Sequence, residues 1–291
     1  MPTGTFARRF QATVEPLTAM IYFVPEAAEE YAAVGIDPVA GYFMSRSAAM
    51  GRVSASVVAS TFYNFSPTLV RNVVNWDEHD PAVVLTARHK AVRRSLERLI
   101  SDESGAPPDV TRLVALLKQA VAGAPPEGRP LFAAHAALSW PDDDIVGVWH
   151  GANCLREFRG DCHIALLISH GMNAVDALML NGAYAGTTTF LMNSRMWGDA
   201  AYEASREALR ARGFFDADGA LTDGGRKFRD MIEMETDRLS AAPFEALGSA
   251  ACEELESLLV PLVRRLGDRK GAPGYLMKGF AAVHGDTRAL A

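Results

Sequence analysis

The stretch from Trp149 to Gly171, WHGANCLREFRGDCHIALLISHG, gathers three histidines, two cysteines, two arginines, a glutamate and an aspartate between apolar residues. Such side chains could bind zinc, transfer protons, or pair with one another where helices pack. His150 and Cys154 lie four residues apart and would share one helical face. Zinc sites, however, use three or four ligands at spacings that this stretch lacks. The sequence therefore predicts neither a metal site nor a cofactor, and it leaves proton transfer and helix packing open.

Four side chains are candidates for acid–base catalysis. His163 and Asp161 stand within this stretch, Glu15 precedes a proline in an apolar N-terminal segment, and Asp77 lies near a histidine in NWDEHDP. A carboxylate and an imidazole can exchange protons with a bound molecule. Each also has a structural alternative. Asp161 follows a glycine and would serve as the N-cap of a helix that ends at Gly171.

A second set of residues could hold the substrate. Arginines among apolar residues need an anionic partner, which is either a protein group or a ligand. Aromatic rings with a few polar groups are typical of small-molecule cavities, although aromatics at helical spacing also occur in plain cores. The predicted substrate-binding residues are Arg46, Arg156, Arg159, Tyr22, Tyr63 and Asn64.

The elements that must position these residues are mainly helical. Prolines and N-cap residues stand where helices should begin, for example at Pro25, Ser54 and Asp109. The chain is long enough for two domains. We predict a helical domain over residues 1–130, and long helices followed by a winged-helix-like domain over residues 131–291. No internal repeat is visible in the sequence.

The segment over residues 199–238 has the element order of a winged helix. A helix ended by Gly213 precedes two phenylalanines, a DADG turn and a return towards Leu221, and another helix follows. Apolar residues on both sides of a tight turn are typical of a β-hairpin. The predicted fold class is therefore mainly α: an N-terminal helical bundle and a C-terminal winged-helix-like domain that contains a short β-hairpin.

Several stretches resemble a known family. LREFRGDCHIALL, ALRARGFFDADGALTDGGRKFRDMIEMETDRLSAAPFEALG, EPLTAMIYF and GYFMSRSAAMG with TFYNFSP are similar to an actinobacterial family of MarR-like, winged helix-turn-helix proteins of unassigned function. The resemblance covers nearly the whole chain and implies a helical N-terminal half followed by a winged helix. The chain departs from the family pattern at Thr18 and Ser66, where histidines are common, and at Cys162, where glycine is.

Charge argues against a DNA-binding surface. The chain has a formal net charge of −6, and residues 199–238 hold seven basic and ten acidic side chains, a net charge of −3. Proteins gain much of their affinity for DNA by neutralising phosphates with lysine and arginine. Arg206 and Arg210 share a helical face and could still contact phosphates. DNA is therefore a possible partner, but not the favoured one.

Three functions remain open. The favoured one is a cofactor-independent enzyme of specialised metabolism that cyclises, isomerises or eliminates from a small organic molecule by acid–base chemistry. The alternative is a winged-helix transcriptional regulator that responds to a ligand, and the third is a non-catalytic partner of another enzyme. We expect a homodimer or heterodimer. No long apolar run or signal-peptide core is present, which predicts a cytoplasmic location without membrane contact.

Overall fold

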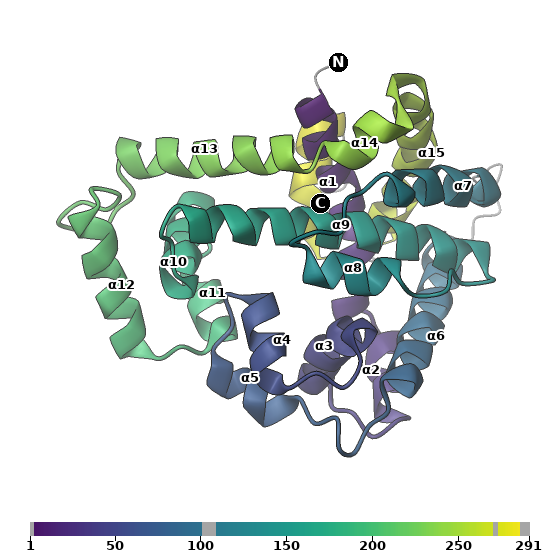
Figure 1. Cartoon of the computed structure of the whole chain (residues 1–291), viewed down its shortest axis with the longest axis horizontal. Coiled ribbons are helices and arrows are strands. Elements are labelled where there is room, and N and C mark those ends of the chain that lie inside the picture. Colours follow the sequence, from purple (N-terminus) through teal and green to yellow (C-terminus); the bar gives the residue numbers. More distant parts are fainter. Residues whose placement is uncertain (1–2, 101–108, 270–272, 286–291) are drawn as a thin grey trace.

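The computed structural model describes residues 3–100, 109–269 and 273–285, which form helices joined by turns and loops (Figure 1). The first half contains α1 (Thr3–Ala19), η1 (Met20–Tyr22), α2 (Pro25–Ala32), α3 (Pro38–Ser47), η2 (Ala48–Met50), α4 (Ala55–Phe62), α5 (Pro67–Val73), α6 (Pro81–Ile100), α7 (Val110–Ala122) and α8 (Pro130–Ala136). The second half contains α9 (Asp144–Ser169), α10 (Ala174–Ala185), α11 (Thr188–Arg195), α12 (Asp199–Ala211), α13 (Asp223–Leu239), α14 (Ala242–Leu247), α15 (Ser249–Asp268) and α16 (Gly274–His284). The predicted mainly α class is confirmed.

The predicted β-hairpin is wrong, because the segment between α12 and α13 contains no strand. Phe215 and Leu221 form a single isolated antiparallel bridge. Between them, the Asp216 carboxylate accepts hydrogen bonds from the amides of Asp218 and Ala220 at 3.0 and 2.8 Å. This side-chain turn satisfies backbone groups locally, and only one residue pair is left to form a bridge.

Two segments of the chain share one order of α-helices, although only the first also contains the 3-10 helix η2. The first comprises α3 to α6 (residues 38–100) and the second α10 to α13 (residues 174–239), and we call them the first and the second unit. α3 packs against α5 and α6, as α10 packs against α12 and α13. The preceding helices correspond as well, because α2 packs against α6 and α9 packs against α13.

The turns of the two units also match. Each unit begins with a side-chain N-cap, Asp37 or Asn173, two residues after a glycine with positive φ. α4 and α11 are each eight residues long. α4 is followed by Tyr63 and α11 by Met196, and both residues have a positive φ. No other non-glycine residue in the described structure has a positive φ. The same local construction therefore occurs twice in the chain.

The longest helix, α9, crosses the middle of the molecule (Figure 1). It continues through Gly160, so the predicted start of a helix at Asp161 is wrong. Its N-cap is Asp143, whose carboxylate accepts from two amides of the first turn. α1, α6, α7, α8 and α13 all pack against α9.

Taken singly, no described helix is long and apolar enough to cross a membrane; α9 and α10 would qualify only as a pair, bent by 109°.

The buried apolar side chains form two cores. The larger extends from Phe6 through the first unit to Cys162 of α9 and includes α14, α15 and α16. The smaller lies within the end of α9 and the second unit, from Leu167 to Ile232. The domain boundary between residues 130 and 131 stays a prediction, and α9 contributes side chains to both cores.

Two glycines of α9 give a test of the close packing of α7 on α9. A methyl group at Gly151 would lie 2.7 Å from Leu117 Cβ and 2.9 Å from the Trp140 ring, whereas one at Gly160 would meet nothing closer than 3.7 Å. We expect Gly151→Ala to lower the free energy of unfolding by about 1–3 kcal/mol, because the core has no room. Gly160→Ala should raise it by roughly 0.5–1 kcal/mol through helix propensity. Urea denaturation measures both; equal stability of the two variants would contradict the packing.

Candidate functional site

The middle of α9 carries charged residues into the interior. Glu157 is only 1 % exposed. Arg46 of α3 donates from Nε and Nη2 to the two carboxylate oxygens of Glu157 at 2.8 and 2.6 Å, and from Nη1 to the Tyr42 hydroxyl at 3.1 Å. A bidentate pair of this kind satisfies both carboxylate oxygens with charged donors. It joins the first unit to α9.

Arg156 brings α1 into the same chain of charges. Its Nε and Nη2 each donate to a Glu15 carboxylate oxygen at 2.8 Å, and its Nη1 lies 3.5 Å from Glu157 Oε1. Gln11 donates a further hydrogen bond to Glu15 at 2.7 Å. We call Arg46, Glu157, Arg156 and Glu15 the central charge chain. Three of its members are predicted site residues, and Glu157 is one that the sequence analysis missed.

The acids of the central charge chain are ionised. Burial alone would raise the pKa of Glu157, but the guanidinium groups of Arg46 and Arg156 lower it to about 2. Burial opposes ionisation of Glu15 as well, yet Arg156 lowers its pKa. Carboxylates held ionised in this way are weak proton acceptors at neutral pH. Their geometry suits holding the helices and binding a polar molecule better than general base catalysis.

Arg159 connects α9 with α13. Its Nη2 donates to Glu233 and Asp237 at 2.7 and 2.8 Å, and Arg8 and Arg229 approach the same two acids. The Nε of Arg159 is buried and has no acceptor in the described structure. A guanidinium N–H without an acceptor is a donor that an incoming ligand can satisfy.

A pocket of about 280 Å³ lies beside these charges. α1 contributes Glu15 to its lining, α9 contributes Arg159, α13 contributes Glu233 and α16 contributes Tyr275. Its wall therefore combines helices from both ends of the chain. Two of the predicted residues, Glu15 and Arg159, line this pocket, and we call it the central pocket.

Three exposed aromatic rings gather around Tyr275. Tyr275 is 48 % exposed, and the rings of Phe23 and Phe190 have their centroids 6.0 and 6.1 Å from it. Phe23 and Phe190 are 49 % and 54 % exposed. Exposed apolar side chains that cluster, rather than occur singly, mark binding surfaces. We call these three residues the aromatic rim. The sequence analysis missed them, because they come from three distant segments.

Arg195 of α11 is a further cation that the sequence analysis missed. Its guanidinium lies 4.2 Å from the centre of the Phe65 ring, and its Nη1 donates to the Ser194 hydroxyl at 2.8 Å. No described carboxylate forms a salt bridge with it, and its Nε is buried without an acceptor among the described residues. Burial, and then repulsion by Arg46, lowers the pKa of Arg195, whose charge also acts on Tyr275.

Tyr22, a predicted substrate-binding residue, lies near the central charge chain, and its role stays a prediction. Its ring lies 4.7 Å from that of Tyr42, and its hydroxyl is 3.5 Å from Nη2 of Arg88. Burial raises the pKa of Tyr22 against the opposing charge of Arg88. The phenol is therefore neutral and acts as a hydrogen-bonding group.

Asp161 and His163 face other helices. The Asp161 carboxylate accepts from the amides of Leu131 and Phe132 at 3.0 and 2.9 Å, and so caps α8. Burial raises its pKa to about 6. His163 Nδ1 lies 3.0 Å from the Thr236 hydroxyl, and burial lowers its pKa to about 4. Neither residue lines the central pocket.

The remaining predicted residues lie elsewhere. Asp77 is exposed in the loop between α5 and α6. The Tyr63 hydroxyl donates to the Met172 carbonyl, and the Asn64 carbonyl accepts from the Trp197 indole at 2.9 Å. Asn64 therefore joins the first unit to the second, and Tyr63 joins it to the α9–α10 connection. Tyr63 also lines a separate pocket of about 310 Å³ over α4 and α5.

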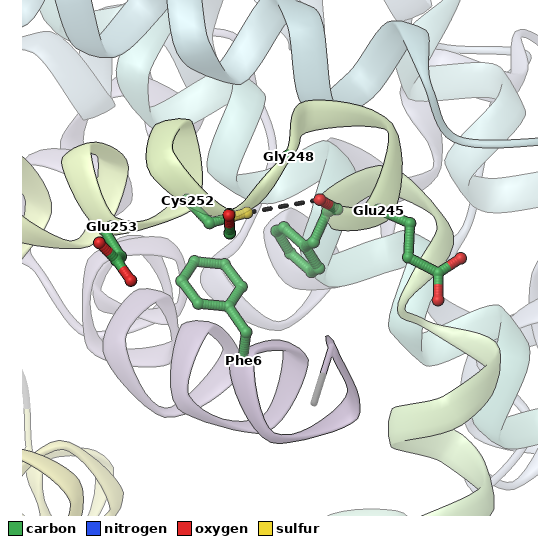
Figure 2. Close-up of a pocket in the computed structure, with 7 residues that line it drawn as sticks. Phe6, Glu245, Gly248, Cys252 and Glu253 are labelled. Atoms are coloured by element: carbon green, nitrogen blue, oxygen red, sulfur yellow. Dashed lines mark hydrogen bonds between the residues drawn. The ribbon is translucent and has the colours of Figure 1, made fainter. Parts of the chain in front are cut away.

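Another pocket, of about 240 Å³, lies between α1 and the α14–α15 turn (Figure 2). Phe6 and Phe244 form its apolar wall, and Glu253 stands at its edge. The Cys252 thiol is turned to the Phe244 carbonyl at 3.4 Å. Burial and the charge of Glu256 raise the pKa of this thiol to about 11, which leaves it unreactive as a nucleophile. None of the predicted site residues lines this pocket.

Comparison with known proteins assigns the chain to a family. The profile of a helix-turn-helix family matches residues 7–273, which include both units. The chain belongs to this helix-turn-helix family. The match supports the helix-turn-helix part of the resemblance seen in the sequence. No curated protein and no solved structure matches the chain.

α12 is the helix that the winged-helix order predicted from the sequence would make the recognition helix. DNA-binding members of such folds present basic and amide side chains of this helix to the major groove. Here the exposed polar residues of α12 are acidic: Asp199, Glu203 and Glu207. Arg206 is paired with Glu203 at 2.8 Å, and Arg210 donates to the Asp216 carbonyl. This helix is poorly suited to the phosphates and base edges of DNA.

The buried pair of Arg46 and Glu157 gives a test of the central charge chain. Glu157→Gln removes the charge that compensates Arg46, and we expect a loss of about 3–5 kcal/mol in the free energy of unfolding. The double variant Arg46→Met, Glu157→Leu leaves no unpaired charge at this pair and should recover much of that loss. Guanidinium denaturation of the three proteins measures the difference. A double variant as unstable as Glu157→Gln would contradict the pairing.

Buried neutral histidines predict a loss of stability in acid. Burial lowers the pKa of His135 to about 3 and that of His89, His150 and His163 to about 4. Between pH 6.5 and 4 the unfolded chain therefore binds more protons than the folded one, so stability falls as the pH falls. Each such histidine contributes a slope of up to about 1.4 kcal/mol per pH unit. Denaturation at several pH values measures the slope, and His163→Asn should reduce it; a flat profile would contradict the burial.

Proposed function

We propose that the protein is a ligand-binding helix-turn-helix protein, and that its ligand is a small organic anion with an aromatic or apolar body. The observation that carries this proposal is the pair of cations Arg159 and Arg195, each with a buried Nε–H that has no acceptor in the described structure. Arg159 lines the central pocket, and the charge of Arg195 acts on Tyr275 at the same pocket. An anionic group in the central pocket would supply an acceptor to Arg159, and the charge of Arg195 would attract it from the side of Tyr275.

The aromatic rim supplies the complementary surface for the body of the ligand. Its three rings come from the η1–α2 connection, α11 and α16, so a molecule held there contacts both the first half and the second unit. Small-molecule sites combine mostly apolar walls with a few placed polar groups. A pocket of about 280 Å³ is close to the lower limit of such sites, which favours a ligand of one or two rings.

Binding at this place would act on the second unit. Arg195 ends α11, and its carbonyl accepts from the Ser66 amide at the start of α5 at 2.9 Å. An anion bound at Arg195 would therefore act next to the hydrogen bond that connects α11 of the second unit with α5 of the first. A ligand shifts a conformational equilibrium only through contacts that differ between the states, and we propose that the contacts at this joint between the units do so. The protein would thus respond to its ligand through the second unit.

This proposal keeps the ligand response of the regulator predicted from the sequence, but it does not include a DNA-binding surface on α12. The family membership favours it, whereas the acidic face of α12 argues that any DNA contact uses another surface. The acid–base enzyme predicted from the sequence is the second candidate, and one observation favours it: the Glu15 carboxylate lines the central pocket. Its pairing with Arg156 suits binding better than proton transfer.

Naphthalene-2-carboxylate is a suitable probe, because it joins one carboxylate to two aromatic rings. We expect saturable binding by isothermal titration calorimetry, and a loss of at least about tenfold in affinity for Arg195→Gln, since that variant lacks the cation. Tyr275→Ala should weaken binding by removing part of the aromatic rim. The neutral analogue naphthalene-2-methanol should bind more weakly than the acid.

Arg93→Gln is the matched control, because Arg93 is exposed on α6 and pairs with Glu97. It should bind the probe as the wild type does. Equal affinity of wild type and Arg195→Gln, or equal affinity for the acid and the alcohol, would refute the site.

A further inference from the structure

Arg88 of α6 is a third described arginine with a buried Nε that lacks an acceptor, and it does not line the central pocket. It is 1 % exposed. Its Nη1 donates to the Ser45 carbonyl at 2.9 Å, and its Nη2 has only two long contacts, 3.5 Å to the Tyr22 hydroxyl and 3.5 Å to Asn153 Oδ1. The guanidinium stacks on the Trp149 ring, 4.7 Å from its centre. All of these partners are neutral.

No described carboxylate compensates the charge of Arg88. Among the described residues none forms a salt bridge with it, whereas Arg46 and Arg156 each have one. Glu157 of α9, the buried carboxylate of the central charge chain, is already paired with Arg46 and Arg156. A buried charge without a counterion is costly, so such groups are normally paired.

The groups around Arg88 include several donors without an acceptor, beside two hydroxyl groups, those of Tyr31 and Ser45, that also lack a partner in the described structure. Three buried nitrogen atoms lack an acceptor in the described structure: Arg88 Nε, Trp149 Nε1 and Asn153 Nδ2. Trp149 and Asn153 are four residues apart and so lie on one face of α9, and both side chains approach Arg88. An indole or guanidinium N–H can only donate. Buried groups left unsatisfied in this way indicate a bound ion or water.

The histidines nearby cannot supply the missing negative charge. Three histidines lie close enough to Arg88 for its charge to lower their pKa: His89, His135 and His150. Burial, with Arg88 contributing, lowers the pKa of His135 to about 3 and that of His89 and His150 to about 4. They are neutral at pH 7, so the cluster carries one net positive charge.

We propose that a small monovalent anion, chloride in the cell, binds at Arg88 and accepts hydrogen bonds from the unpartnered nitrogens of Arg88, Trp149 and Asn153. An anion fits better than water, since it accepts from every donor and also neutralises the guanidinium. The anion is small, because Arg88, Trp149 and Asn153 are at most 1 % exposed. This site is independent of the ligand proposed for the central pocket. It would serve as the counterion where α6 packs on α9.

Halide dependence of stability tests this proposal. Wild-type protein is dialysed exhaustively into sodium gluconate, and its thermal midpoint is then measured as chloride or bromide replaces gluconate at constant ionic strength. A ligand that binds only the folded state raises the midpoint by mass action, by about 3 °C for each tenfold increase above its dissociation constant. Crystals grown in sodium bromide should show an anomalous peak beside Arg88.

Asn153→Asp is the decisive variant, because it places a carboxylate where Asn153 Oδ1 now lies, 3.5 Å from Arg88 Nη2. It should fold in gluconate and show no halide dependence. Trp149→Phe keeps the stacked ring but loses one donor, and should need more halide for the same rise. Arg93→Met, an exposed arginine of the same helix, should respond as the wild type does.

Three results would overturn the proposal. The first is a wild-type midpoint that is the same in chloride and in gluconate. The second is an Asn153→Asp protein with the halide dependence of the wild type. The third is a bromide crystal without a peak at Arg88.

Discussion

The arrangement of the molecule depends on the ionised side chains that α9 carries into the core. A buried carboxylate or guanidinium is tolerated only when a partner of opposite charge meets it with good geometry. Glu157 finds its partner on α3, Arg156 on α1 and Arg159 on α13. Since these three helices lie far apart in the sequence, the pairs fix how the first half and the second unit are placed around α9. Apolar packing alone tolerates exchanges of similar side chains, whereas a bidentate pair has few alternatives.

Much of the helical framework could be predicted from local signals. Ser54 and Asp109 cap helices as the sequence indicates, and Pro25 opens one. The hairpin after Gly213 and the helix start at Asp161 were wrong for a shared reason, because both residues involved have acceptor side chains that act elsewhere. Asp216 closes a turn that leaves one bridge, and Asp161 caps α8, a helix about thirty residues earlier. Local propensity shows that an aspartate accepts amides, but not which amides.

The site was predictable to a similar extent. Buried arginines need an anionic partner, either a protein group or a ligand, and for Arg46 and Arg156 the structure shows protein carboxylates. Arg88 and Arg195 were not singled out, because their sequence neighbours, Ala87 and His89 for Arg88 and Ser194 and Met196 for Arg195, do not distinguish them from arginines that find an acid. What distinguishes Arg88 and Arg195 is that no described carboxylate pairs with them in the folded protein, which is a property of the tertiary structure. The repeat of the two units was hidden in the same way, since it is carried by caps, helix lengths and positive φ values rather than by residue identities.

In the second unit, the exposed polar face of α12 and the residues proposed to hold a ligand lie on different helices. The exposed polar residues of α12 are acidic, whereas Arg195 and Phe190 belong to α11. Charge changes on α12 would therefore leave Arg195 and Phe190 in place. The construction of the unit constrains the turns and the buried apolar positions, not the charge of the solvent face. A unit of this construction can therefore keep its fold with an acidic α12, and the ligand proposed for the central pocket would depend on α11 rather than on that face.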